Sequence, residues 1–335
     1  MASPHHSATG AELDTGALAA AVVAGDRRAL AQAITLVEST RSDHRADAND
    51  LLERLIPHAG NSIRLGISGV PGVGKSTFIE SLGNYLIDEG HKVAVLAVDP
   101  SSAVSGGSIL GDKTRMEFLS RRTEAFIRPS PAGETLGGVA RRTRETMLAV
   151  EAAGFDVVLI ETVGVGQSET TVSQMTDMFL LLLLPAGGDE LQGIKRGIVE
   201  LADLILVNKA DGDLALPAEQ SVTDYRKAMM FMAHRADEWQ VPVEAMSALG
   251  GDRTADVWKM VEDYRDMRET KGLITEKRAE QSINWMWNEI RNGLVERLRA
   301  TPEVSAQVAE LELAVRENNI SPTSAADELM EIFIK

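Results

Sequence analysis

The stretch Gly69-Val-Pro-Gly-Val-Gly-Lys75-Ser76-Thr77 decides the fold of this chain. It follows an apolar run at residues 63–67, which is typical of a buried parallel strand, and it precedes apolar residues at helical spacing between Phe78 and Ile87. A strand, the pattern GxxxxGK[ST] and a helix, in that order, are the phosphate-binding loop in its required context. The glycines let backbone N–H groups wrap around an anion, and the new helix directs its partial positive charge at the same point. The stretch therefore predicts a binding site for a nucleoside triphosphate.

The loop supplies most of the residues expected to bind the phosphates. These are Gly69, Val70, Pro71, Gly72, Val73, Gly74, Lys75, Ser76 and Thr77. Lys75 is expected to reach the β- and γ-phosphates and to act in catalysis, and the Ser76 hydroxyl is expected to hold Mg²⁺.

Composition limits the classes of protein to which the chain can belong. With 335 residues and 44% hydrophobic residues, the chain can bury a large core. A formal net charge of −16 argues against a nucleic-acid partner, because contacts with phosphates need a basic surface. The absence of cysteine excludes disulfides and thiolate metal sites. The N-terminus has no apolar signal segment, and no apolar run approaches the roughly 20 residues that span a membrane. We expect a soluble cytoplasmic protein without a membrane partner.

The core of the chain alternates strand and helix patterns. Strands are expected at residues 63–68, 92–98, 125–128, 156–161, 178–184, 204–208 and 242–246, with helical stretches between them. Near-continuous apolar strands separated by helices predict an α/β fold, a mostly parallel P-loop NTPase sheet covered by helices on both faces. The expected organisation is a disordered tail (1–12), a helical extension (13–60), the P-loop nucleotide-binding domain (61–270) and a C-terminal helical arm (271–335) for dimerisation.

A second motif, Asn208-Lys209-Ala210-Asp211, follows the strand predicted at residues 204–208. Asp211 can accept hydrogen bonds from both N1–H and the 2-amino group of guanine, which adenine cannot satisfy. Asn208 suits the edge of the guanine, and the stem of Lys209 can lie over the ring. The segment Ser247-Ala248-Leu249, after the last strand, stands where a second base-contacting loop belongs. Together with the phosphate loop, this motif predicts GTP and GDP as ligands.

A third group of residues is expected around the γ-phosphate. The strand predicted at residues 156–161 ends in Glu161 and leads into a glycine loop that contains Gly164 and Gln167. Most GTPases have aspartate at the position of Glu161; the longer glutamate permits a Mg²⁺ contact through water or a salt bridge that changes with nucleotide state. No glutamine follows Gly164 directly, and Gln167 is a distant substitute. We therefore expect slow intrinsic hydrolysis that a partner accelerates.

Two further loops carry charged candidates. Asp99 ends the second strand and Asp112 lies in a glycine-rich segment, and both are assigned to the Mg²⁺ shell. Residues 185–197 form another glycine-rich charged segment, in which Lys195 opposite Glu161 would give an ion pair that depends on the nucleotide. A plain connection between strand and helix would look the same, and the residues alone do not separate the two interpretations.

Several arginines cluster in sequence between the third and fourth strands. They are Arg121, Arg122, Arg128, Arg141, Arg142 and Arg144. They could meet an acidic partner or act on phosphate, but solvated helix faces are the favoured interpretation.

The combined motifs resemble one family. GISGVPGVGKST, LAVDPSS, GGSILGDKTRM, the loop ETVGVGQSE, QGIKRGI and NKAD together are similar to the methylmalonyl-CoA mutase-associated GTPases (the MeaB/ArgK/MMAA type). The resemblance spans roughly residues 60–270. It implies a SIMIBI-class G protein that chaperones an adenosylcobalamin-dependent mutase, gates cofactor delivery and protects the mutase from inactivation. It also implies a homodimer formed by the C-terminal helices, and it favours a switch role for the segment that contains Lys195.

Two other functions share the P-loop. A nickel metallochaperone GTPase would need soft or imidazole ligands, but the chain has no cysteine and its six histidines are scattered. A small-molecule or amino-acid kinase would need an acceptor site, and no such motif is apparent, while NKAD favours guanine.

Overall fold

Seven strands form one sheet at the centre of the computed structural model, which describes residues 13–98, 116–129, 136–162, 168–185, 196–232 and 239–334. The order across the sheet is β3-β2-β4-β1-β5-β6-β7, and all neighbouring strands are parallel. The strands are β1 (Ile63–Gly69), β2 (Val93–Val98), β3 (Ala125–Arg128), β4 (Val157–Thr162), β5 (Met178–Leu183), β6 (Leu204–Val207) and β7 (Val243–Ala245). The predicted α/β fold is confirmed, and each strand ends within one residue of its expected bounds.

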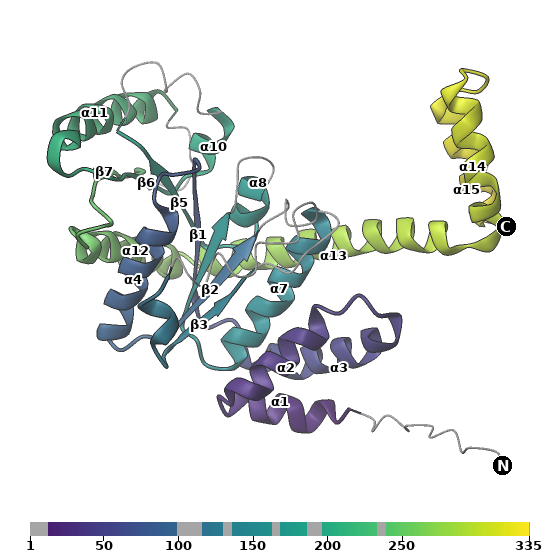
Figure 1. Cartoon of the computed structure of the whole chain (residues 1–335), viewed down its shortest axis with the longest axis horizontal. Helices are drawn as coiled ribbons and strands as arrows, with labels where there is room; N and C mark the ends of the chain where they lie inside the picture. Colours follow the sequence, from purple (N-terminus) through teal and green to yellow (C-terminus); the bar gives the residue numbers. More distant parts are fainter. Residues whose placement is uncertain are drawn as a thin grey trace, which may run out of the picture. The chain divides into compact units, whose positions relative to one another are not determined.

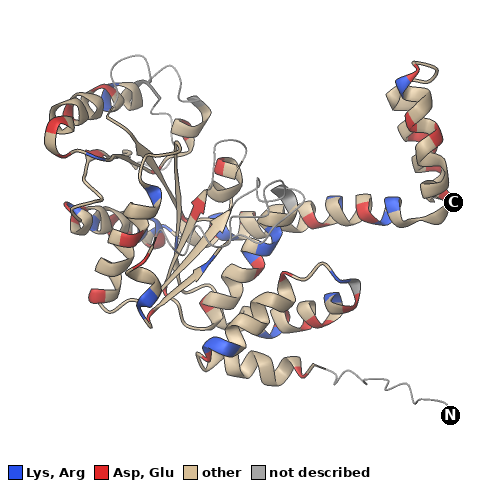
Figure 2. Cartoon of the chain, viewed as in Figure 1, with Lys and Arg blue, Asp and Glu red and all other residues tan. Residues whose placement is uncertain are grey.

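Helices cover both faces of this sheet, because five of its strands are buried at every position. Alternate residues of a strand point to opposite faces. Leu65 of β1 therefore packs with α4 (Lys75–Asp88) and α12 (Thr254–Thr270). On the opposite face lie α7 (Leu136–Ala152), α8 (Ser168–Ser173), α10 (Arg196–Leu201) and α11 (Ala215–Met232) (Figure 1). Figure 2 shows the charged residues mostly on the helices and few of them on the strands.

Three N-terminal helices extend the hydrophobic core on the α7 side of the sheet. They are α1 (Thr15–Val23), α2 (Arg27–Val37) and α3 (Arg45–Leu55), and they share buried apolar side chains with α7. Asp26 caps α2 by accepting from the backbone N–H groups of Arg28 and Ala29. These bonds, that of Ala29 foremost, lower the pKa of Asp26. Glu38, at the end of α2, pairs with Arg128 of β3 and so ties the extension to the sheet.

Short 3₁₀ segments complete the connections. They are η1 (Ser42–His44), η2 (Ile56–His58), η4 (Leu119–Arg121) and η5 (Gly212–Leu214).

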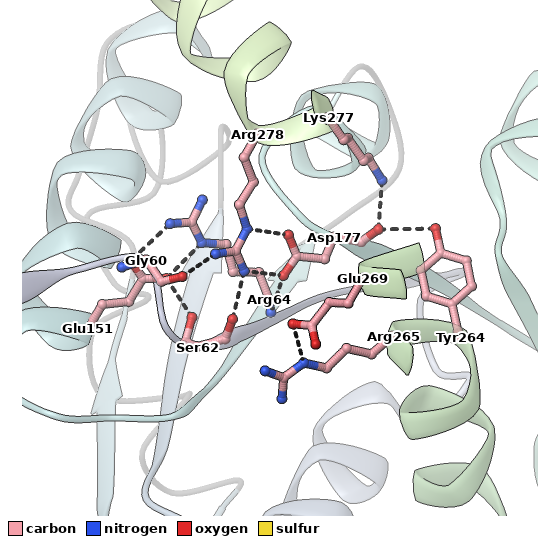
Figure 3. A network of polar contacts seen from close by, with 10 residues as sticks. All are labelled: Gly60, Ser62, Arg64, Glu151, Asp177, Tyr264, Arg265, Glu269, Lys277 and Arg278. Atoms are coloured by element: carbon pink, nitrogen blue, oxygen red, sulfur yellow. Dashed lines mark hydrogen bonds and ion pairs between the residues drawn. The ribbon is translucent and has the colours of Figure 1, made fainter. Parts of the chain in front are cut away.

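A buried polar network joins the amino ends of β1 and β5 to α13 (Leu273–Ala300) (Figure 3). Asp177 accepts from the backbone N–H of Arg64 and from Arg278, whose Nε lies 2.8 Å from Asp177 Oδ1. Arg278 also donates to the carbonyls of Gly60 and Ser62, and Arg64 pairs with Glu151 at 2.7 Å. Burial lowers the pKa of Arg278, but its bond with Asp177 and the nearby carboxylates raise that pKa by more, so the guanidinium stays charged.

The chain divides within α13 into two compact units, residues 1–278 and 279–335. The second unit contains the rest of α13 together with α14 (Pro302–Arg316) and α15 (Pro322–Ile334), and the latter two helices pack against each other. The part of α13 in this unit carries an exposed apolar stripe at helical spacing, here called the α13 stripe. Its members are Ile283, Met286, Trp287, Ile290 and Leu294.

Two members of the arginine cluster do not lie on the solvated faces that the sequence suggests, whereas Arg121 is exposed as expected. Arg142 and Arg144 on α7 are buried, with exposed fractions of 9% and 5%. Arg144 donates to the carbonyl of Gln174, which follows α8. The expectation was wrong for these two residues because α7 is covered on more than one side, by the N-terminal helices as well as by α8.

No helix in the described ranges is both long and apolar enough to cross a membrane.

Candidate functional site

The phosphate-binding loop connects β1 to α4, as its sequence predicts. Gly69 and Gly74 both have positive φ angles, and neither position has room for a side chain. A Cβ at Gly69 would lie 2.4 Å from the carbonyl oxygen of Leu182 on the neighbouring strand, and one at Gly74 would lie 2.7 Å from Asn208 Nδ2. Val73 is fully buried beneath the loop, while Pro71 and Gly72 are exposed. The backbone therefore forms a tight turn, held from below, that leads directly into the first turn of a 14-residue helix.

Lys75 opens α4 and folds back over this turn. Its Nζ donates to the carbonyl of Gly69 at 2.8 Å, and its side chain is largely buried. The cation is thus held beside the loop whose N–H groups are expected to bind phosphate. Ser76 is the next residue, and its Oγ lies 3.3 Å from Glu161 Oε1. Thr77 follows on the same helical turn, half-buried.

Glu161 reaches this point because β4 and β1 are neighbours in the sheet. Glu161 pairs in register with Ile67 of β1, two residues before the loop. Thr162 donates to Ser68 Oγ at 2.9 Å, which ties the ends of the two strands together. A hydroxyl and a carboxylate at this spacing are the hard oxygen ligands that Mg²⁺ takes, together with phosphate oxygens and water. The residues present fit a magnesium nucleotide. No group of three His, Cys, Asp or Glu side chains that could hold a metal occurs among the described residues.

Asn208 lies between the phosphate loop and the candidate base loop. Its Nδ2 donates to the carbonyl of Val73 at 2.7 Å, and its Oδ1 accepts from the N–H of Ala248 at 2.9 Å. The side chain is 1% exposed. The sequence predicts Asn208 at the guanine edge; in the structure it joins the phosphate loop to the candidate base loop, which is possible because Gly74 has no Cβ.

Asp211 belongs to the same motif, and its side chain contacts the candidate base loop at Ser247. The Ser247 hydroxyl donates to Asp211 Oδ2, which leaves Oδ1 and further lone pairs of the carboxylate for a ligand. Lys209 lies between Asn208 and Asp211 with a φ of 62°, in the left-handed region that few non-glycine residues adopt. The two motifs predicted to read guanine are therefore in contact through their side chains.

The segment from Ser247 to Asp252 forms a closed loop. Ser247 and Asp252 form an isolated antiparallel bridge, and the N–H of Asp252 donates to the carbonyl of Ser247 at 3.1 Å. Ala248 is buried, whereas Leu249 at the tip is 86% exposed. Leu249 therefore projects from the tip of the loop into solvent. We call residues 247–252 the base loop.

Arg253 follows the base loop and is not predicted as a site residue from the sequence. It has a φ of 63° and it precedes the first residue of α12. Its guanidinium donates to the carbonyl of Ala245 at 3.1 Å and pairs with Glu244 and Asp256. Burial lowers the pKa of Arg253, but the bond with Asp256 and the attraction of Glu244 raise it by more. A Gly-Gly-Asp-Arg sequence between a predicted base contact and a helix is the signal that could have drawn attention to it.

Several predicted site residues lie outside the described residues. They are Asp99, Asp112, Gln167 and Lys195, and with them the segments expected to respond to the γ-phosphate.

Known proteins resemble this chain over most of its length. The sequence profile of the family described as "Methylmalonyl Co-A mutase-associated GTPase MeaB" matches residues 30–303. A "Putative GTPase" of Caulobacter vibrioides is 54% identical over 321 residues, covering 96% of this chain and 98% of that protein. The mouse "Methylmalonic aciduria type A homolog, mitochondrial" is 46% identical, covering 93% of this chain and 78% of that protein. A crystal structure of a "LAO/AO transport system kinase" superposes with a TM-score of 0.75 at 38% identity, covering 96% of this chain and 98% of the other.

Proposed function

Because the chain belongs to the MeaB family of methylmalonyl-CoA mutase-associated GTPases, we propose that it hydrolyses GTP to time its action on an adenosylcobalamin-dependent mutase. In this proposal it acts in the cytoplasm as a chaperone of methylmalonyl-CoA mutase, gates the delivery of the cofactor and protects the mutase from inactivation. The observation that carries the nucleotide assignment is Asn208, which binds the phosphate loop on one side and the base loop on the other. The Asn208 amide thus sets the distance between the loop that binds the phosphates and the loop that contacts the base.

The triphosphate lies along the loop from Gly69 to Thr77, with its charge facing the N–H groups at the start of α4. Water attacks the γ-phosphorus in line with the bond to the leaving oxygen of GDP, and the products are GDP and phosphate. Lys75 stabilises negative charge on the β- and γ-phosphates. Ser76 and Glu161, with Asp99 and Asp112, hold Mg²⁺ when it is bound; the ion supplies positive charge to the phosphate oxygens.

The loops after β4 and β5 form the switch in this proposal. Glu161 pairs with Lys195 in one nucleotide state and with the magnesium shell in the other, and Gln167 is the candidate for orienting water. Segments of this kind are ordered by the γ-phosphate and released after hydrolysis. The intrinsic rate is slow because no residue directly after Gly164 is suited to position the water.

The decisive experiment measures GTP turnover with and without the mutase. Single-turnover hydrolysis is followed for the chain alone, with methylmalonyl-CoA mutase, and with an unrelated protein of similar charge. The proposal predicts slow hydrolysis alone and faster hydrolysis with the mutase only. Equal rates in all three would contradict the chaperone role while leaving the GTPase intact. Transfer of the γ-phosphate to an amino acid or a protein would instead support a kinase.

Replacing Lys75 with alanine should lower GTP affinity by roughly 100-fold and abolish measurable hydrolysis. A charge-assisted hydrogen bond contributes about 1.5–3 kcal/mol, and Lys75 makes its bonds where the phosphate charge is concentrated. Titration calorimetry with GTP and a phosphate-release assay measure the two effects. Lys227→Ala, at an exposed position on α11, is the matched control and should behave as wild type. Full affinity in the Lys75 variant would remove the phosphate loop from the proposal.

We further propose that the α13 stripe is the surface on which two copies of the chain associate. Its side chains are 40–55% exposed and lie on one side of a long helix, an arrangement that a soluble monomer rarely leaves uncovered. The partner in this interface is a second copy of the chain, because a twofold axis brings the same stripe against itself.

Replacing Trp287 with aspartate should convert a dimer into a monomer. Buried tryptophans are common hot spots, with truncation costing about 2 kcal/mol or more, so the dimer should weaken at least tenfold. Light scattering coupled to gel filtration gives the mass. Asn292→Asp adds the same charge on the opposite side of the helix and should leave the dimer unchanged. A wild-type chain that is monomeric at all concentrations would exclude this interface.

A further inference from the structure

Backbone strain in the described chain is concentrated at the candidate base site. The described non-glycine residues with positive φ are Lys209, Arg253 and Asn318. The first two lie among or next to the residues proposed to bind guanine. Lys209 belongs to the motif that contains Asp211, and Arg253 directly follows the base loop. Non-glycine residues persist in this conformation only when the surrounding contacts hold them there. Those contacts are explicit for Arg253.

The guanidinium of Arg253 holds the two ends of the base loop together. The place where these two ends meet, between Ala245 and the start of α12, is here called the neck. Its Nη1 donates to the carbonyl of Ala245, the last residue of β7, at 3.1 Å. Its Nε reaches Asp256 in the first turn of α12 at 3.2 Å, and its Nη2 lies 3.2 Å from Glu244. One side chain therefore binds the strand that enters the loop and the helix that leaves it. These contacts of Arg253 adjoin the bridge between Ser247 and Asp252, and both hold the two ends of the base loop together.

The closed loop positions the two groups that meet the NKAD motif. Ser247 donates to the Asp211 carboxylate, and the N–H of Ala248 donates to Asn208. If the neck opened, both donors would move away, and the Asp211 carboxylate would lose the bond that sets its rotation. The placement of this carboxylate is what separates guanine from bases that lack its 2-amino group.

We propose that Arg253 is a positioning residue for guanine selectivity, acting through the base loop on Asp211. This inference rests on the proposed function, because it takes Asp211 as the group that reads the base. Arg253 itself touches no part of the nucleotide in this proposal. The three nitrogens of its planar guanidinium contact the carbonyl and the two carboxylates at once, which the single nitrogen of lysine cannot do in the same geometry.

Arg226 of α11 provides a matched control, because it contacts the same strand, β7. It donates to the carbonyl of Val243 at 3.0 Å and to Glu244 at 2.6 Å, so it shares a carboxylate partner with Arg253. Both guanidinium groups are partly exposed. Arg226, however, does not join the two ends of the base loop. Replacing Arg226 removes one positive charge beside Glu244 of β7, as replacing Arg253 does, but it leaves the contacts at the neck unchanged.

The test compares the affinities for GTP and inosine triphosphate, whose base lacks the 2-amino group. The ratio of the two dissociation constants is measured by calorimetry for wild type, Arg253→Gln, Arg253→Lys, Arg253→Gly and Arg226→Gln, each checked for an unchanged circular dichroism spectrum. We expect the ratio to fall at least fivefold in Arg253→Gln and in Arg253→Gly, and less in Arg253→Lys. Turnover at saturating GTP should stay within twofold, and Arg226→Gln should keep the wild-type ratio.

Three results would overturn the inference. A wild-type ratio in Arg253→Gln would show that the neck does not need the guanidinium. An equal fall in Arg226→Gln would assign the effect to general weakening of β7, and a wild-type ratio in Arg253→Gly would assign it to backbone strain alone. Failure of the proposed function is distinguishable from these, because the wild-type chain itself would then bind GTP no better than inosine or adenosine triphosphate.

Discussion

Replacing Asp211 with asparagine is expected to lower the affinity for GTP by at least about 100-fold and to create affinity for xanthosine triphosphate. The carboxylate accepts two hydrogen bonds from guanine in the proposed complex, and each charge-assisted bond contributes about 1.5–3 kcal/mol. In the variant, the NH₂ group of asparagine faces the 2-amino group of guanine, and two donors cannot form a hydrogen bond with each other. Xanthine has a carbonyl at that position, which the amide can satisfy. Titrations with both nucleotides measure the exchange.

The control for this prediction is Asp213→Asn, two residues further along the chain. Asp213 lies in η5, is exposed, and carries the same charge. It should leave both affinities unchanged. Retained GTP affinity in the Asp211 variant would remove the NKAD motif from base recognition, even if the phosphate loop still bound the triphosphate. The two ends of the ligand are thus tested separately.

Breaking the polar network at the amino ends of β1 and β5 should cause the largest loss of stability. Asp177→Ala leaves the Arg278 guanidinium buried without its carboxylate, although Gly60 and Ser62 still accept from it (Figure 3). Removing one partner of a buried ion pair costs about 3–5 kcal/mol, because the remaining charge cannot regain its water. We expect a fall in the unfolding temperature of roughly 10 °C. Scanning calorimetry measures it.

An exposed pair of the same type provides the control. Arg41 and Asp43 form an ion pair with both side chains mostly in solvent, and Asp43→Ala should change the unfolding temperature little. The double variant Asp177→Ala with Arg278→Met should recover part of the loss, because no uncompensated charge then stays buried. Equal effects at the buried and exposed pairs would show that the network in Figure 3 contributes no more than a surface contact.

Local pattern was sufficient for the elements and for the position of the phosphate loop. The apolar run before Gly69 and the helical spacing after Lys75 placed the phosphate loop, and each strand was found within one residue of its predicted bounds. Glu161 and Ser76 were predicted to act together, and the structure brings their oxygens within 3.3 Å. Such features follow from residue type and spacing over short distances, because strand and helix periodicities are properties of the local chain.

Position across the sheet could not be deduced in the same way. The order β3-β2-β4-β1-β5-β6-β7 puts β1 between β4 and β5, which are 88 or more residues further along the chain. Arg142 and Arg144 were predicted to face solvent, since nothing in their spacing reveals that further helices cover α7. Burial of a charged residue depends on what packs against it, and the sequence around it does not contain that information.

Residue type and spacing by themselves determined the P-loop, the parallel α/β fold and the candidate guanine motif. Only the tertiary structure decided that Asn208 joins two loops, that Arg253 closes the base loop, and that Arg278 binds the amino ends of two strands. For Asn208 and Arg278 the physical reason is that the role is a contact between segments remote in sequence, whereas Arg253 joins a strand and a helix that lie within a few residues of it but meet only once the base loop has closed. A hydrogen bond between Asn208 and Val73 spans 135 residues, and one between Arg278 and Ser62 spans 216. Such partners are selected by the packed sheet, which brings their backbones together, and not by the identity of neighbouring residues.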